Sequence, residues 1–291
     1  MNNLTDKQKG KMLALIGILF ITPDSLFIRM VGLNSWDLVF YRGFLPFIFL
    51  LIGLLWYYKK NFLKSLFAIG IAGIVNALIV AFTNITFIVS LENTNVANTL
   101  IMLSLSPFMA AILSGIFLKE LPEKRTWIAI ILCIFFTIYI FYDSYTAGRF
   151  IGDLFGFITA LLVAASQVVL RYGKLVNFLP SLLIAKLFTA IFVIYFVKDF
   201  TLIGNDIFLI PIMCLFCVTI PLALITLAPR YIPAHEVALF FLLETTLGPL
   251  WVWIFINEAP SIKALIGGGL IIITIIVHSY FDLLKNKNQS S

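Results

Sequence analysis

The chain of 291 residues is 62% hydrophobic and only 12% charged, whereas soluble domains carry roughly 25% charged residues. Its net charge of +6 comes from basic residues scattered between apolar runs, which argues against a nucleic-acid-binding protein, and three cysteines are too few for a disulfide-stabilised scaffold. These values exclude an ordinary soluble domain and indicate a multi-pass protein of the lipid bilayer.

Ten apolar runs follow one another along the chain, and each is long enough to cross a bilayer as a helix. We expect spanning helices at residues 12–31, 37–56, 65–90, 94–118, 126–142, 153–173, 178–197, 206–228, 234–256 and 261–281. The first run is too long for the core of a signal peptide and lacks a small-residue cleavage site, so we interpret it as a retained helix. The predicted fold class is therefore an all-α membrane protein with ten transmembrane helices.

The basic residues predict how these helices are oriented. With the N-terminus placed inside, fourteen of the 20 lysines and arginines lie in inner segments, three in outer loops and three within spans. Short cytoplasmic loops carry an excess of lysine and arginine. We therefore expect an inner-membrane protein with both termini in the cytoplasm.

A motif near the end of the fourth predicted helix returns near the end of the ninth. The segments 116–122 and 254–260 share the pattern Ile-Phe-x-x-Glu-x-Pro at an offset of 138 positions. Because five helices per half is an odd number, the halves would be inverted repeats that can expose one midplane site to each side in turn. We predict one repeat at 12–142 and another at 153–281. Chance similarity between apolar helices is the alternative, and the shared motif disfavours it.

Longer segments of both halves carry a family pattern. They are Asp24–Arg29, Trp36–Arg42 and Ser106-Pro107 in the first half, and Leu242–Trp251 with Glu258 in the second. The chain resembles the drug/metabolite transporter superfamily, specifically proteins with two EamA-like repeats. It departs from the commoner pattern in having Thr245, not proline, directly after Glu244. The resemblance implies transport of a small metabolite without ATP or cofactor, with export favoured.

Two acidic residues are expected at mid-depth in the bilayer. At ~1.5 Å per residue, Asp24 lies about 18 Å into the first helix and Glu244 about 15 Å into the ninth. An ionisable group there costs about 2.5–3.5 kcal/mol on insertion scales, so it usually faces a cavity or a partner. We hypothesise that Glu244, with Asp24 second, binds a cationic substrate group or a coupling proton. A structural carboxyl paired with a neighbouring helix is the alternative.

Three basic residues also fall within predicted spans. Guanidinium groups bind carboxylates through paired hydrogen bonds, so Arg42 could receive an anionic substrate group near the outer mouth. Arg29 ends the first helix and is expected to extend to the interface. Lys186, about 12 Å into the seventh helix, either binds substrate or pairs with Glu244 or Asp24.

Further candidates for substrate binding are Asn76, Thr245 and Trp251. The amide of Asn76 could line a polar path or bond a neighbouring helix. Pro249 removes a backbone hydrogen bond and frees the carbonyl of Thr245. Trp251 lies about two turns beyond Glu244 on nearly the same face, which makes it a candidate aromatic wall. We interpret Gln167 as a structural partner of an arginine four residues later.

The sequence offers no signal for chemistry beyond transport. Cys214 and Cys217 have the spacing of a zinc or redox pair, but they lie at lipid depth without a second pair, so we predict no metal site. No nucleophile–base–acid set or nucleotide-binding loop is apparent, so we predict that the chain is not an enzyme. The predicted function is an alternating-access carrier of a small polar or zwitterionic metabolite such as an amino acid. A lipid flippase, and less favourably a membrane-embedded enzyme, remain alternatives, and no pattern defines an oligomeric state.

Overall fold

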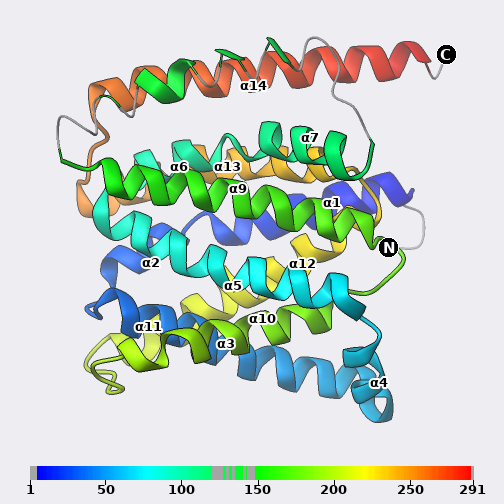
Figure 1. Cartoon of the computed structure of the whole chain (residues 1–291). Helices are drawn as coiled ribbons and strands as arrows, with labels where there is room; N and C mark the ends of the chain where they lie inside the picture. The colour runs from blue at the N-terminus through cyan, green and yellow to red at the C-terminus, as the bar shows by residue number, and fades with distance from the viewer. Residues whose placement is uncertain are drawn as a thin grey trace.

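The computed structural model describes residues 5–119, 127–128, 131–132, 135–139, 142 and 148–289, with backbone alone for 264, 275 and 278–289. Over these residues the chain forms helices and no strand, and most of the helices lie side by side along a common direction (Figure 1). The predicted all-α class is confirmed.

The helices of this bundle are numbered as in Figure 1. In chain order they are α1 (Asp6–Ile21), α2 (Asp24–Met30), α3 (Ser35–Tyr58), α4 (Phe62–Phe67), α5 (Gly70–Asn93), α6 (Val96–Leu103), α7 (Ser106–Phe117), α9 (Phe150–Tyr172), α10 (Leu179–Val193), α11 (Asp206–Ile212), a π-helix (Met213–Thr219), α12 (Ile220–Leu227), α13 (Ala234–Ile256) and α14 (Ile262–Gln289).

Eight stretches of the described chain are long and apolar enough to cross a membrane, and they coincide with eight of the ten predicted spans. The predicted span at 126–142 falls largely outside the described residues, as does Glu120 of the first motif copy. The predicted tenth span corresponds to α14, whose apolar stretch Leu265–Thr274 is shorter. The count of ten helices and the inverted relation of the halves therefore stay predictions.

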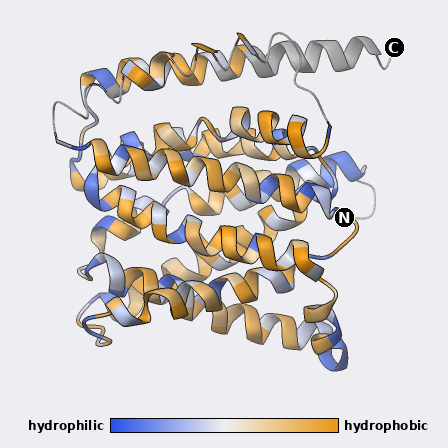
Figure 2. Cartoon of the chain, viewed as in Figure 1, coloured by the Kyte–Doolittle hydropathy of each residue, from blue (hydrophilic) through white to orange (hydrophobic). Residues whose placement is uncertain are grey.

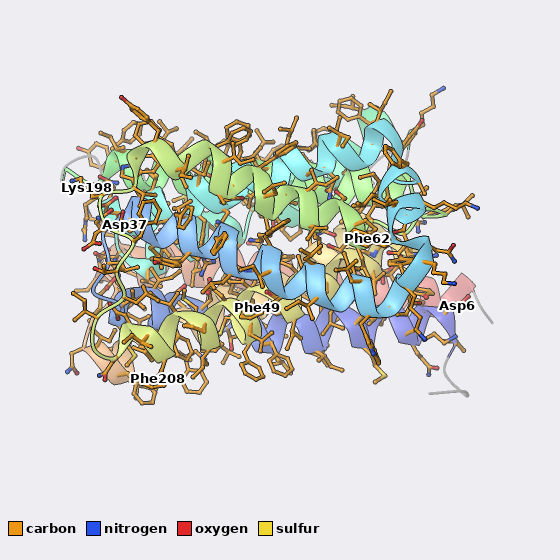
Figure 3. The ribbon with its side chains drawn as sticks, turned by 90° about the horizontal axis from the view of Figure 1, so that it is seen from below. Asp6, Asp37, Phe49, Phe62, Lys198 and Phe208 are labelled. Atoms are coloured by element: carbon orange, nitrogen blue, oxygen red, sulfur yellow. The ribbon has the colours of Figure 1, made fainter. Side chains whose placement is uncertain are left out.

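The ends of the bundle are polar and its middle is apolar. Figure 2 shows hydrophilic residues gathered where helices begin and end, and hydrophobic residues along the helices between them. Asp6 and Phe62 mark one end, and Asp37, Lys198 and Phe208 mark the other (Figure 3). We name these the inner end and the outer end, following the predicted orientation. The helix α14 runs back toward the inner end, which is also the end at which α1 begins (Figure 1).

Proline breaks the first span close to mid-depth. The helix α1 stops at Ile21 and α2 starts at Asp24, with Pro23 between them. The hydroxyl of Thr22 donates to the Leu19 carbonyl at 3.0 Å, which recovers the acceptor that Pro23 leaves without its N–H. The break places Asp24 in the first turn of a new helix inside the bundle, which is how an aspartate comes to lie at this depth.

The seventh described span is also irregular near its centre. A π-helix, Met213–Thr219, lies between Pro211 and Pro221, and the Thr219 hydroxyl donates to the Cys214 carbonyl at 2.7 Å. Single π-helical turns inside α-helices often occur at functional sites. Here the π-helix passes directly beside the buried charges described below, because Met213 contacts Arg42.

Candidate functional site

A cavity lies between the helices, with an empty volume of about 800 Å³ that includes space open to solvent. Residues from α1, α2, α3, α5, α6, α9, α10, α12, α13 and the π-helix line it, so both halves of the chain contribute. Four charged side chains face this one space. They are Asp24, Arg42, Lys186 and Glu244.

Asp24 and Arg42 form a buried, two-pronged ion pair. The Nη1 and Nη2 atoms of Arg42 donate to the two carboxylate oxygens of Asp24 at 2.6 and 2.8 Å, and its Nε donates to Asn84 Oδ1 at 3.3 Å. The side chains are only 2% and 6% exposed. The guanidinium is therefore occupied by Asp24, rather than presented to the outer mouth as the sequence suggested.

Lys186 and Glu244 lie in the same cavity without such partners. Both residues are buried, with 1% and 3% exposure. Among the described residues, neither side chain makes a hydrogen bond or an ion pair, so Lys186 does not pair with Glu244 or Asp24. Because a charge in a low-dielectric interior is costly without compensation, this free cation and free acid are the groups most in need of a ligand.

The other three predicted binding residues lie outside the cavity lining. Asn76 donates to Ser181 Oγ at 3.2 Å and accepts from Ser166 Oγ at 2.8 Å, which ties α5 to α10 and α9. The Thr245 hydroxyl donates to a carbonyl of its own helix. Trp251 Nε1 donates to Thr22 Oγ1 at 3.3 Å beside the break after α1. In this arrangement the polar groups of all three side chains bond other parts of the protein, and their predicted role in substrate binding stays a prediction.

Two amide side chains in the lining were not among the predicted binding residues. Asn84 Nδ2 and Gln167 Oε1 are buried without a hydrogen-bond partner in the described chain. Gln167 does not bond the arginine four residues later, since Arg171 donates instead to the Pro229 carbonyl at 3.4 Å. The available signal was the presence of Ser166 and Gln167 in an otherwise apolar stretch of α9, but such residues serve interhelical bonds equally often.

Gly43, next to Arg42, lets α3 approach α10 at the level of Lys186. A Cβ added at Gly43 would lie 2.7 Å from the Ala190 backbone nitrogen and 3.0 Å from the Lys186 carbonyl oxygen. These are backbone atoms, so the helices would have to separate. The spacing of the two helices, and with it the position of both cations, depends on this glycine.

We expect Gly43→Ala to lower the melting temperature of the purified protein and to reduce transport, because overpacking a close helix contact costs about 1–3 kcal/mol. Gly53→Ala is the matched control, since it lies on the same helix and an added Cβ there meets nothing within 4 Å. Thermal unfolding in detergent and uptake into liposomes measure both effects. Equal behaviour of the two variants would contradict this role for Gly43.

Residues 8–142 match the model of the EamA-like transporter family. This half of the chain belongs to the EamA-like transporter family. The match covers the predicted first repeat, 12–142, and the second repeat at 153–281 stays a prediction. Together with the apolar helices, it makes the chain a multi-pass membrane transporter of the drug/metabolite type.

The fold of this EamA-like transporter has a counterpart among solved structures. One crystal structure superposes with a TM-score of 0.67 over 94% of this chain and 97% of that chain, at 14% sequence identity. At this identity the likeness shows the fold alone, and it extends over both halves of the chain. No curated protein matches the sequence.

Proposed function

We propose that this EamA-like transporter moves a small zwitterionic, amino-acid-like metabolite by alternating access, with export favoured. The observation that carries the proposal is the presence of an unpaired cation, Lys186, and an unpaired acid, Glu244, in one buried cavity. A zwitterion brings one charge of each sign, so it compensates both groups at once. A molecule with a single charge would leave one of them uncompensated.

The uncharged part of the lining supports a substrate with some hydrocarbon. Most of the remaining wall is apolar, and it includes Val163, Leu182, Leu222, Ile225 and Phe241. Small-molecule sites typically combine such walls with a few polar groups that set the orientation of the ligand. The amides of Asn84 and Gln167 add neutral hydrogen-bonding capacity beside the charges.

The cavity extends toward the inner end, which supports binding of the substrate from that side. Asp24, Arg42 and Phe87 line its outer part, whereas Leu170 and Thr226 lie near the inner ends of α9 and α12. The space therefore extends from the charged groups toward the predicted cytoplasmic side. A carrier in this conformation is suited to accept a cytoplasmic metabolite, which agrees with export.

Glu244 is a better candidate for proton coupling than Asp24. Both oxygens of Asp24 accept hydrogen bonds from Arg42, so the charge of Asp24 is already compensated in this state. An unpaired carboxylate in the membrane is costly, and either a bound ammonium group or a proton removes that cost. Competition of these two ligands for Glu244 would couple substrate movement to protons.

Binding of matched ligands to the purified protein tests the proposal. The probes are leucine, its decarboxylated amine and its N-acetyl derivative, which carry both charges, the positive charge alone and the negative charge alone. We expect leucine to raise the melting temperature most. In Lys186→Gln, leucine should bind at least about 30-fold more weakly, since breaking a buried hydrogen-bonded charge pair costs 2–5 kcal/mol, while the amine should lose much less.

The same experiment can contradict the proposal. If the N-acetyl derivative or the amine stabilises the protein more than leucine, the substrate is not a zwitterion of this kind. If Lys186→Gln weakens leucine and the amine equally, Lys186 does not receive the carboxylate.

A further inference from the structure

The outer end of the bundle is closed by more polar contacts than the inner end in the described part of the chain. Asp37 accepts from the Lys198 backbone N–H at 2.8 Å, and Figure 3 places these two residues at this end. The Tyr41 hydroxyl donates to the Phe200 carbonyl at 2.5 Å. These contacts surround a buried apolar cluster that includes Leu38 and Leu91. We interpret these contacts and this cluster as the closure between the cavity and the outer side.

Most of the outer contacts join helices that already pack closely. Asp37 and Tyr41 lie on α3 and contact the segment after α10, and α3 and α10 are among the most extensively packed pairs. Thr94 donates to Asp153 of α9 at 2.7 Å, and it directly follows α5, which packs along α9. Contacts of this kind hold pairs of helices together and do not need to break for the bundle to open between other helices.

In contrast to these pairwise contacts, the carboxylate of Glu258 joins three segments of the chain. Its Oε1 accepts from the backbone N–H of Val96, the first residue of α6, at 2.8 Å. Its Oε2 lies 3.1 Å from Nε of Arg29, near the end of α2. Arg29 Nη2 in turn donates to the Thr94 carbonyl at 3.0 Å. Arg29 therefore does not simply extend to the interface, and Glu258 connects the segment after α13 to both α2 and α6.

The backbone before Glu258 directs the side chain into this position. Asn257 ends α13 in the left-handed conformation, with φ of 61° and ψ of 22°. Asparagine is one of the few non-glycine residues that adopt this conformation readily. The chain thus turns sharply at Asn257, and the next residue reaches across to the start of α6. This geometry accounts for Glu258 of the repeated motif, which the substrate cavity does not use.

We propose that Glu258, bound to Arg29 and to the Val96 N–H, is the outer gate contact that holds the transporter closed toward the outside. The proposal rests on the alternating access of the proposed function. The helix α13 carries Glu244, α2 carries Asp24, and α6 contributes Leu103 to the cavity wall. Separating α2 and α13 from α6 would open the site outward, and this separation breaks the contacts of Glu258. Glu258 acts through the positions of these helices and is a positioning residue.

Accessibility of a cysteine from the outer side tests this role without a substrate. The reporter is Phe87→Cys, at the outer part of the cavity, in a chain whose natural cysteines are replaced by alanine. It is reconstituted in liposomes, and vesicles whose outer end faces the bath receive a membrane-impermeant thiol reagent. We expect Glu258→Gln to raise the labelling rate about fivefold or more, since losing a charge-assisted contact shifts the population toward the open form. Glu258→Asp should give a smaller increase.

Glu236→Gln is the matched control, because Glu236 lies 3.9 Å from Lys7 at the inner end and is also a partly exposed acid in an ion pair. It should leave outer labelling unchanged. Unchanged outer labelling in Glu258→Gln, or an equal rise in Glu236→Gln, would overturn the proposal. A lower melting temperature in Glu258→Gln without a change in labelling would show a structural role only. Loss of leucine binding bears on the proposed substrate and not on the gate, so the two proposals fail separately.

Discussion

Glu244→Gln is expected to reduce transport by at least about 30-fold while the protein still folds, since breaking a buried charge pair with a ligand costs 2–5 kcal/mol. Glu244 has no ion-pair partner in the described chain, so removing its charge strands no other group. The neutral side chain keeps the shape of the site but can neither compensate an ammonium group nor release a proton. The melting temperature without ligand should therefore stay equal or rise.

Thr245→Val is the matched control, because the neighbouring side chain is also buried in α13 but bonds only its own helix. Transport by both variants is measured in liposomes with and without a pH gradient. We expect the gradient to stimulate the parent and Thr245→Val, and not Glu244→Gln. Normal transport and an unchanged response to the gradient in Glu244→Gln would exclude this residue from both substrate and proton binding.

Asp24→Asn should instead act mainly on stability. It removes the charge that compensates Arg42, whose side chain is 6% exposed. Breaking a buried pair by removing one partner costs about 3–5 kcal/mol, because the remaining charge is left uncompensated. At about 2–4 °C per kcal/mol, the melting temperature should fall by roughly 10 °C.

The double variant Asp24→Leu/Arg42→Met separates stability from function. Replacing both members of a buried pair by apolar residues of similar volume is often neutral or stabilising. We expect it to recover most of the lost melting temperature. A double variant as unstable as Asp24→Asn would show that Arg42 matters through its contacts to Asn84 or Met213 rather than through Asp24.

The sequence identified the charged members of the site better than their pairing. Asp24, Arg42, Lys186 and Glu244 were all candidates, and all four line the cavity. Position along a spanning helix follows from residue counting at ~1.5 Å per residue, which placed Asp24 and Glu244 at mid-depth and Arg42 nearer the outer mouth. Which cation faces which acid was not predictable, because pairing depends on how far each helix is rotated about its axis.

The unknown rotation of each helix about its axis also explains why three candidates lie outside the cavity lining. Asn76, Thr245 and Trp251 lie at suitable depths but do not line the cavity. In a soluble helix, apolar periodicity marks the buried face. In a spanning helix the lipid face and the packed face are both apolar, so this pattern does not predict rotation. The break at Pro23, in contrast, was predictable, because proline acts within one turn of its own helix.

The amino-acid sequence alone determined the membrane class, the approximate positions of eight spans, the positions of Asp24 and Glu244 along their helices, and the repeated motif that contains Glu258. These follow from local composition and from counting along the chain. The tertiary structure alone decided that Asp24 neutralises Arg42, that Lys186 and Glu244 stay free, and that Glu258 joins α2 to α6. Those contacts link residues up to 229 positions apart, and only the packing of helices about their axes brings such residues within hydrogen-bonding distance.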